Sequence, residues 1–241
     1  MIYRKFLRFL LISFIILFMA GTSYVSAQDQ GARPEKTHQD NTPGKSWINR
    51  LERPDRIPGL KTDEVIKCLK LKPGDVIADI GSGTGAYTIP FAKAVAPSGV
   101  AYGVDIHKDL LKYIMAKAKK EKVTNLKTIL ADLDDPKLPK NKVDVVFFHD
   151  VFHNTNDRLG YLKTLSTYLK PTSRIVIIEQ EFDDPIAMKW DIPEDRIKKE
   201  QVDDWMSKIG FHLSDEFDIF QGSNNPPGTG MPARWFVVYQ R

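Results

Sequence analysis

Short apolar runs alternate with amphipathic segments along most of the chain. The apolar runs are rich in β-branched residues and cover residues 76–80, 100–105, 126–131, 143–149 and 174–179. Their nearly continuous apolar character predicts strands that are covered on both faces, as in a parallel sheet. Two further runs, 211–220 and 234–240, predict two more strands near the C-terminus.

The segments between these runs have the apolar spacing of surface helices. In residues 108–121 the apolar side chains form one stripe, and lysines occupy the opposite face. Residues 158–169 and 193–209 show the same spacing, and Gly210 is placed to end the second of these helices. Strand and helix therefore alternate, and this order predicts a doubly wound α/β sheet.

The first 27 residues have a different pattern. Arg4, Lys5 and Arg8 precede an apolar run, and small residues follow it up to Ala27. This three-part pattern is typical of a secretory signal peptide, residues 1–27, and the apolar run is short for a helix that spans a bilayer. The polar residues 28–46 are expected to form a flexible linker, and residues 47–241 one folded domain.

The leader predicts that the domain is exported, to the periplasm or out of the cell, after cleavage near Ala27. Two alternatives are open. An uncleaved leader would anchor the protein in the membrane through residues 6–20, and a true start at Met19 would leave a cytosolic protein.

Composition and charge exclude several classes of protein. With 42% hydrophobic and 27% charged residues, the chain is neither collagen-like nor disordered. Its net charge of +4 arises mostly in the leader, so the rest is nearly neutral and has no electrostatic footprint for nucleic acid. The single cysteine, Cys68, excludes an internal disulfide and a thiolate metal site.

Candidate ligand-binding residues follow the first strand, because such sheets bind ligands beyond the carboxyl ends of their strands. The strand contains Asp79, and Gly81, Gly83 and Gly85 follow it. These glycines allow a tight turn whose backbone amides face a carboxylate or a phosphate. The spacing is not the dinucleotide fingerprint, because Ala86 stands where that pattern has its last glycine.

Two more acids lie at neighbouring strand ends. Asp105 ends the second strand and is able to accept two hydrogen bonds from a ribose diol. Asp132 follows the third strand, where its carboxylate is able to accept from an adenine amino group. Together with the glycine turn, these acids predict a pocket for a nucleoside that carries a cationic or zwitterionic tail.

This ordered set of motifs resembles the class I S-adenosylmethionine-dependent methyltransferases, and most closely the small-molecule group that includes the ubiquinone and menaquinone biosynthesis enzymes. The resemblance spans about residues 61–210 and rests on residues 76–85, 104–106, 131–133, 144–150, 168–171 and 174–179. It implies a Rossmann-like sheet of seven strands in the order 3-2-1-4-5-7-6, with the last strand antiparallel and helices on both faces. The chain departs from the family pattern at Thr172-Ser173, where Gly-Gly is frequent, and at Asn154, where many relatives have a second histidine.

The resemblance also implies S-adenosylmethionine as the cofactor and gives each part of it a set of residues. The methionine part would be held by Asp79 and the backbone of Gly81, Ser82, Gly83 and Gly85. The ribose hydroxyls would bind to Asp105, and the adenine ring to Ile106, Asp132 and Leu133.

Candidates for catalysis follow the fourth strand: His149, Asp150 and His153. Methyl transfer is an in-line displacement from an activated donor, so the protein supplies positioning and, where the acceptor keeps a proton, a base. A histidine suits that role near neutral pH. Alternatively, the histidines have local structural roles and Asp150 contacts the methionine end of the cofactor. No metal is expected, because His149 and His153 have no third ligand at a suitable spacing.

The sequence therefore predicts a methyltransferase that acts on a small-molecule acceptor. Because the leader would carry the domain away from the cytosolic supply of S-adenosylmethionine, an exported domain that binds the nucleoside without catalysis is the alternative. An NAD(P)-dependent reductase is disfavoured by the glycine spacing. The expected partner is the acceptor, with no nucleic acid, and with membrane contact only through an uncleaved N-terminal segment.

Overall fold

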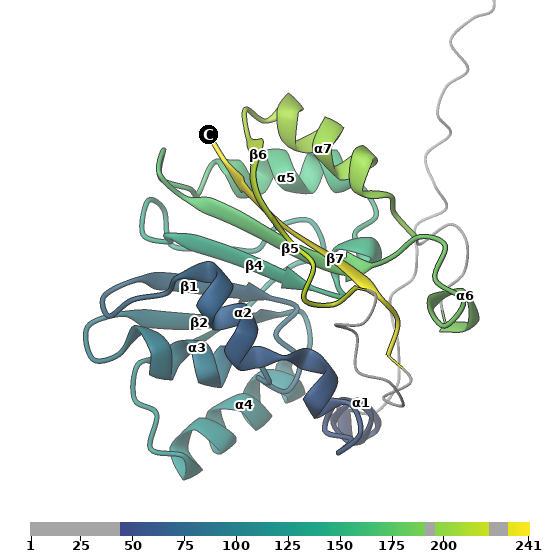
Figure 1. Cartoon of the computed structure of the whole chain (residues 1–241). Coiled ribbons are helices and arrows are strands. Elements are labelled where there is room, and N and C mark those ends of the chain that lie inside the picture. The colour runs from purple at the N-terminus through teal and green to yellow at the C-terminus, as the bar shows by residue number, and fades with distance from the viewer. Residues whose placement is uncertain (1–43, 191–195, 222–230) are drawn as a thin grey trace, which may run out of the picture. The chain divides into compact units, whose positions relative to one another are not determined.

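A seven-stranded sheet in the order β3-β2-β1-β4-β5-β7-β6 organises the folded part of the chain (Figure 1). The computed structural model describes residues 44–190, 196–221 and 231–241. The strands are β1 (Val76–Ile80), β2 (Val100–Asp105), β3 (Leu126–Leu130), β4 (Val145–His149), β5 (Arg174–Gln180), β6 (His212–Phe217) and β7 (Arg234–Gln240). β1 to β5 are parallel, and β7 runs antiparallel to both of its neighbours, β5 and β6. The predicted Rossmann-like fold and strand order are confirmed.

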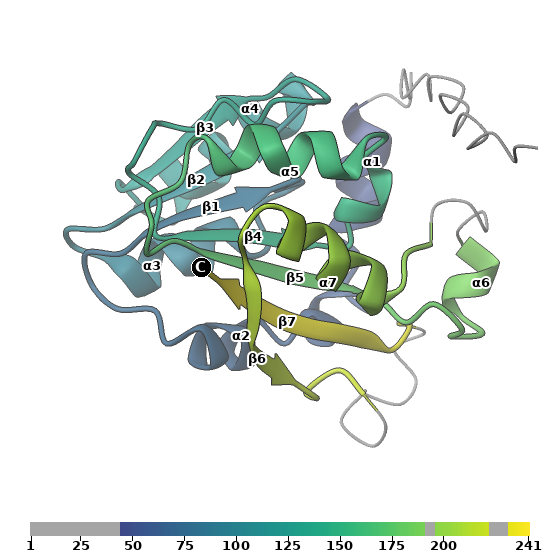
Figure 2. The same ribbon diagram turned by 90° about the horizontal axis from the view of Figure 1, so that it is seen from above.

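Helices cover both faces of the sheet (Figure 2). One face carries α2 (Thr62–Leu69), α3 (Thr88–Val95) and α4 (Lys108–Lys120), and the other carries α5 (Arg158–Ser166) and α7 (Lys199–Lys208). Successive strand residues point to opposite faces of the sheet. Ile77 therefore packs in the core under α2, α3 and α4, and Ala78 in the core under α5 and α7. The central strands β1, β4 and β5 are buried on both faces, as their continuous apolar runs predicted.

Short elements surround the edge where the parallel strands end. They are α1 (Gly44–Leu51), the 3-10 helices η1 (Ile57–Leu60) and η2 (Phe152–Asn154), and α6 (Ala187–Trp190). Lys117 of α4 donates to the carboxylate of Glu52 at 2.9 and 3.1 Å, which ties the end of α1 to the main domain. Within the described ranges, no helix is both long enough and apolar enough to cross a membrane.

Several element boundaries differ from the sequence-based prediction by a few residues, and the differences at α1, α7 and β6 have a clear cause. α1 begins at Gly44 and so includes the last residues of the predicted linker 28–46; the rest of that linker and the predicted signal peptide lie outside the described residues. α7 begins at Lys199, where the Gln201 side chain accepts from the Lys198 N–H. β6 is shorter than the predicted run 211–220, because it is an exposed edge strand with a bulge between Leu213 and Asp215.

Candidate active site

The turn after β1 has a backbone that requires glycine. Gly81, Gly83 and Gly85 all have positive φ angles, of 69°, 54° and 80°. A Cβ atom on Gly81 would lie 2.3 Å from Cγ2 of Val151, so no larger residue fits there without movement. The N–H groups of Gly81 and Ser82 donate to the Val104 carbonyl at 2.8 and 3.1 Å, which fixes the turn to β2. The predicted glycine turn therefore lies at the edge where β1 and β2 end.

Asp79 lies buried beneath this turn, and the Thr88 hydroxyl donates to its Oδ2 at 2.5 Å. Burial raises the pKa of Asp79 from 3.8 to about 7; the Thr88 hydrogen bond opposes this shift and the charge of Asp105 adds to it. The carboxyl is therefore only partly ionised at neutral pH. A cationic group placed beside it would favour the ionised form.

Asp105 holds the glycine turn through its side chain. Its Oδ2 accepts from the Gly83 N–H at 2.9 Å, and its Oδ1 accepts from the His107 N–H at 2.9 Å. Burial raises the pKa of Asp105, and these two backbone hydrogen bonds oppose the shift. A carboxylate offers about four acceptor positions, so two remain for hydroxyl donors such as a ribose diol.

The residues predicted to contact adenine lie beside Asp105 on the surface. Ile106 and Leu133 are 38% and 50% exposed, which is high for large apolar side chains. Asp132 is also exposed and forms an ion pair with Lys137, with 2.6 Å between Oδ1 and Nζ. The structure thus places an exposed apolar surface next to Asp105, the predicted ribose-binding residue. The adenine ring would cover this surface.

Two buried hydroxyl groups in the glycine turn are suited to bind a polar ligand. Ser82 Oγ and Thr84 Oγ1 are buried and have no hydrogen-bond partner among the described residues. Unpaired buried hydroxyls cost stability, and a polar ligand that bound here would satisfy them. Together with the partly ionised Asp79 and the acceptor positions of Asp105, they fit a nucleoside with a zwitterionic amino-acid tail.

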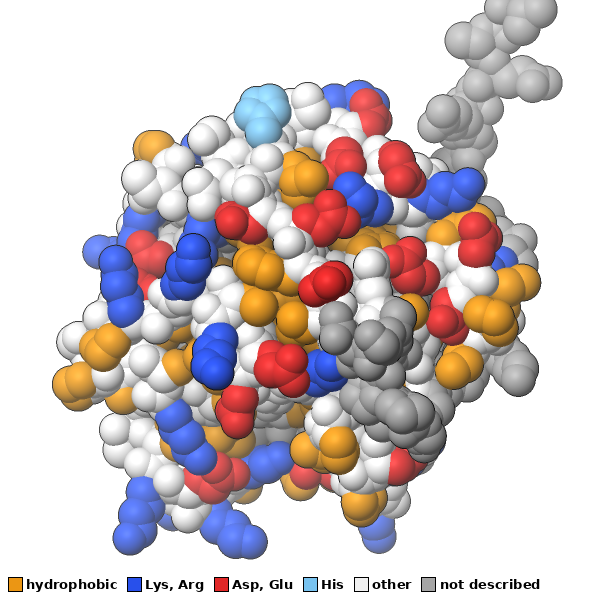
Figure 3. All heavy atoms as spheres, viewed as in Figure 1, with side chains coloured by type: hydrophobic (Ala, Val, Ile, Leu, Met, Phe, Trp, Pro, Cys, Tyr) orange, Lys and Arg blue, Asp and Glu red, His pale blue; other side chains and the backbone are white. Residues whose placement is uncertain are grey.

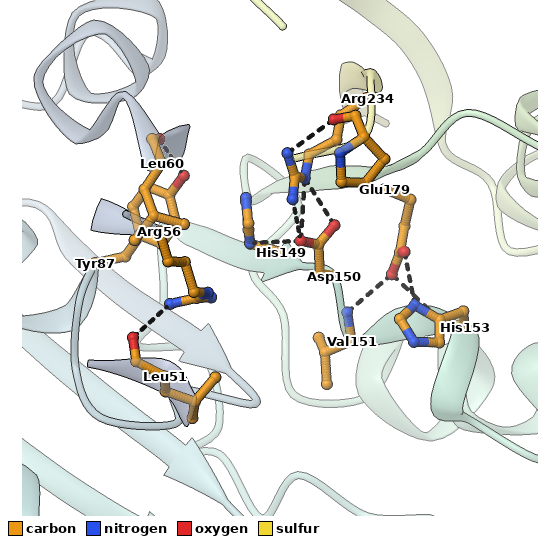
Figure 4. A network of polar contacts seen from close by, with 11 residues as sticks. Leu51, Arg56, Leu60, Tyr87, His149, Asp150, Val151, His153, Glu179 and Arg234 are labelled. Atoms are coloured by element: carbon orange, nitrogen blue, oxygen red, sulfur yellow. Dashed lines mark hydrogen bonds and ion pairs between the residues drawn. The ribbon is translucent and has the colours of Figure 1, made fainter. Parts of the chain in front are cut away.

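Asp150 is the centre of a buried ion pair at the end of β4 (Figure 4). Arg234, which begins β7 and is fully buried, donates three hydrogen bonds to the Asp150 carboxylate at 2.7, 2.9 and 3.0 Å. Burial alone would raise the pKa of Asp150, but the charge of Arg234 outweighs it and holds the pKa well below its ordinary value. Asp150 is therefore an ionised carboxylate that is paired within the protein.

His149 lies between this ion pair and an aromatic cluster. Its ring is 4.9 Å from that of Tyr87 and 6.3 Å from that of Phe220. Burial lowers the pKa of His149 to about 3; the charges of Arg234 and Arg56 act in the same direction and Asp150 opposes them. The imidazole is therefore neutral at physiological pH, and its buried Nε2 has no hydrogen-bond partner in the described part of the chain.

His153 is paired with Glu179 rather than with Asp150. Glu179 is buried in β5, and its Oε2 lies 2.8 Å from Nδ1 of His153. The other carboxylate oxygen accepts from the N–H groups of Val151 and His153, at 2.9 and 3.2 Å, which fixes its position (Figure 4). Because a carboxylate accepts hydrogen bonds, Nδ1 carries the proton and Nε2 is the basic nitrogen.

The structure thus brings the predicted residues to one edge of the sheet but gives them different partners. The two histidines, four residues apart, turn to Asp150 and to Glu179. Among the residues that the structure describes, no group of three or more His, Cys, Asp or Glu side chains is arranged to hold a metal ion.

Sequence reasoning did not include three residues of this edge among the predicted site residues: Glu179, Arg234 and Arg56. A signal existed for Glu179, because it lies near the end of an apolar strand like Asp79 and Asp105. Arg234 begins an antiparallel strand, and the start of such a strand lies at the edge where parallel strands end. Arg56 has no comparable signal, because it precedes a 3-10 helix outside the sheet.

Comparison with known proteins supports the resemblance to methyltransferases that the sequence motifs indicate. A family described as a methyltransferase domain matches residues 71–219, which is more than half of the chain. A demethylmenaquinone methyltransferase from Geobacillus sp. (strain WCH70) is 30% identical over 117 residues, 48% of this chain and 50% of the relative. One from Staphylococcus aureus is 28% identical over 153 residues, 58% of this chain and 63% of the relative. The chain therefore spans about half the length of the first of these relatives.

Solved structures show the same fold. A SAM-dependent methyltransferase from Aquifex aeolicus superimposes with a TM-score of 0.68 at 24% identity, over 80% of this chain and 96% of that one. A magnesium protoporphyrin IX methyltransferase from Synechocystis with bound SAH gives 0.64 at 16% identity, over 83% and 95%. With the family match, these findings show that the chain belongs to the methyltransferase-domain family, in the class I S-adenosylmethionine-dependent group.

Proposed function

We propose that the protein transfers a methyl group from S-adenosylmethionine to a small-molecule acceptor, with His153 as the general base. One observation carries this proposal: the glycine turn with Asp79 and Asp105 lies at the same sheet edge as the His153–Glu179 pair. A binding turn and a positioned base at one edge are what methyl transfer to a protonated acceptor needs. The relatives named as demethylmenaquinone methyltransferases support a quinol-type aromatic acceptor.

When bound, the cofactor supplies a methyl carbon on a positively charged sulfur, which is already activated for in-line displacement. Asp105 accepts from the ribose hydroxyls with the acceptor positions that the backbone leaves open. Asp79 receives the cationic end of the methionine part, and the buried hydroxyls of Ser82 and Thr84 bind its polar groups. These contacts orient the methyl carbon and exclude water from it.

His153 takes the acceptor's proton at Nε2. Glu179 holds the ring through Nδ1 and stabilises the imidazolium that forms, because the carboxylate is buried and 2.8 Å away. His149 and Asp150 are weaker candidates for the base. Burial lowers the pKa of His149 to about 3, and the carboxylate of Asp150 is already held in an ion pair with Arg234.

The proposal is tested with S-adenosylhomocysteine binding and with radiolabelled methyl transfer to a short-chain demethylmenaquinol. Glu179→Gln and His153→Gln should lower turnover by about 10²- to 10⁴-fold while the affinity for S-adenosylhomocysteine changes less than threefold. His212→Gln is the matched control, because His212 is exposed on the edge strand β6. The proposal fails if the protein binds NADH rather than S-adenosylhomocysteine, and the base assignment fails if His153→Gln keeps full turnover.

The surface of the domain supports a small acceptor rather than a nucleic acid. Figure 3 shows acidic and basic side chains interspersed over the face seen in Figure 1, without a continuous basic patch on that face. Nucleic-acid binding requires clustered cations that neutralise phosphates. We therefore retain a small molecule as the partner.

We also propose that the protein is exported, on the strength of the N-terminal pattern of residues 1–27. Mass spectrometry of the native protein tests this directly. A chain that begins close to Gln28 supports export, an intact leader in a membrane fraction supports an anchor, and a soluble chain that begins at Met19 refutes both.

A further inference from the structure

Arg56 is a partly buried cation beside the proposed active site, and its charge is not neutralised. Its Nη1 donates to the Leu51 carbonyl at 3.1 Å. In the part of the chain that the structure describes, no carboxylate lies within ion-pair distance of its guanidinium. Burial lowers the pKa of Arg56, and Asp150 only partly opposes this. A guanidinium has five N–H donors, so most of those of Arg56 remain available.

The acids near Arg56 already have other partners. Asp150 is bound by Arg234 through three hydrogen bonds, and Arg234 also raises the positive charge around Arg56. Glu52 is bound by Lys117. Taken by themselves, Arg56, Arg234 and Asp150 carry one net positive charge, while Glu179, whose charge also acts on Arg234, is turned to His153. An anion of matching shape beside Arg56 would neutralise that positive charge.

The position of Arg56 connects it to the glycine turn. Leu51, whose carbonyl accepts from Arg56, lies against this turn, because a Cβ atom on Gly83 would be 2.9 Å from Leu51 Cδ1. Figure 4 shows Arg56 and Leu51 on one side of His149 and Asp150, and His153 on the other. The charge of Arg56 also acts on the buried His149, whose Nε2 has no partner among the described residues. Arg56 therefore lies close to the glycine turn, where the cofactor is expected to bind.

We propose that Arg56 binds a carboxylate in the active site, with its guanidinium fork as the recognising group. The inference rests on the proposed function, because that function defines the space beside the glycine turn. Two substrates are possible sources of the carboxylate: the methionine part of the cofactor, or an anionic methyl acceptor. The chemistry of recognition is the same for both, and binding experiments separate them.

The test compares Arg56→Gln with Arg53→Gln by calorimetry. Arg53 belongs to the same segment but is half-exposed and paired with Asp55, so it is a matched control. The ligands are S-adenosylhomocysteine and 5′-methylthioadenosine, which has the nucleoside but lacks the carboxylate. If the carboxylate is the cofactor's, Arg56→Gln should weaken S-adenosylhomocysteine about 10- to 100-fold and leave methylthioadenosine within threefold.

If the carboxylate belongs to the acceptor, Arg56→Gln should leave both nucleosides within threefold of the wild type. Benzoate, titrated into the protein saturated with S-adenosylhomocysteine, should then bind to the wild type and to Arg53→Gln, and at least 10-fold more weakly to Arg56→Gln. Arg56→Lys should restore part of the lost affinity in either case, because it keeps the charge but not the fork. Unchanged unfolding temperatures show that the variants are folded.

The inference is overturned if Arg56→Gln changes neither S-adenosylhomocysteine nor benzoate binding, or weakens both nucleosides equally. These results differ from a failure of the proposed function. In that failure the wild-type protein itself does not bind S-adenosylhomocysteine.

Discussion

Arg234→Met is expected to destabilise the fold strongly, because it removes the cation that pairs with a buried carboxylate. Arg234 is fully buried, and the side chain of Asp150 is 16% exposed. The variant keeps most of the apolar volume of the arginine but leaves the buried carboxyl of Asp150 without its counter-charge and with none of its three hydrogen bonds from Arg234. Breaking a buried pair in this way costs about 3–5 kcal/mol of the free energy of unfolding.

A double-mutant cycle separates the charge effect from lost packing. Asp150→Asn leaves Arg234 buried and charged, and asparagine tolerates the left-handed backbone of this position, where φ is 49°. The double variant Asp150→Asn/Arg234→Met contains neither charge. Its cost should be smaller than the sum of the single costs by at least about 2 kcal/mol.

Urea unfolding followed by circular dichroism measures these differences, with an unchanged dependence on urea as the sign of two-state behaviour. A loss of about 3 kcal/mol should lower the unfolding temperature by about 6–12 °C. Arg234 lowers the pKa of Asp150 below its ordinary value of 3.8. The contribution of the pair to the free energy of unfolding is therefore fully present above pH 3.8 and is lost as the pH falls further. Single variants that cost less than about 1 kcal/mol, or costs that simply add, would refute this reasoning.

Three other variants test separate features. Burial raises the pKa of Asp79 to about 7, so its contribution to stability falls as the pH rises from 3.8 towards 7, and Asp79→Asn should flatten the pH dependence measured by urea unfolding. Asp157→Ala should cost about 1 kcal/mol in the same assay, because Asp157 caps α5 by accepting from the Gly160 N–H; no change would argue against the cap. Gly81→Ala should cost at least about 2 kcal/mol by thermal unfolding, and Val151→Ala in the same chain should recover only the part due to the clash, since the positive φ remains.

The sheet was predictable because the apolar residues of its central strands indicate in the sequence that these strands are buried. The runs at β1, β4 and β5 are apolar at nearly every position, and the structure buries them on both faces. β6 was less well predicted, because Phe211 and Phe220 are buried but lie outside the strand, while His212–Phe217 itself is largely exposed. An edge strand is defined by its neighbour, and a local pattern does not contain that information.

The site was predictable where a residue's role follows from its place in a strand. Asp79 and Asp105 belong to strands that end at the ligand edge, and their identity as candidates needed only the topology. The partners were not predictable in the same way. Asp150 and Arg234 are 84 positions apart, and the pair exists because β7 runs antiparallel to β5 and returns its first residue to this edge.

The contrast between Asp79 and Asp150 shows why residue type alone does not assign roles at this edge. Both carboxyls are buried, and burial raises the pKa of each. Asp79 has a neutral hydroxyl as its partner, so burial prevails and its pKa rises to about 7. Asp150 has a guanidinium, so the charge prevails and the acid stays ionised and occupied. Asp79 would therefore contribute most to the binding of a cationic group, and Arg56 to the binding of an anionic group. A zwitterion that spans the glycine turn would pair with both side chains.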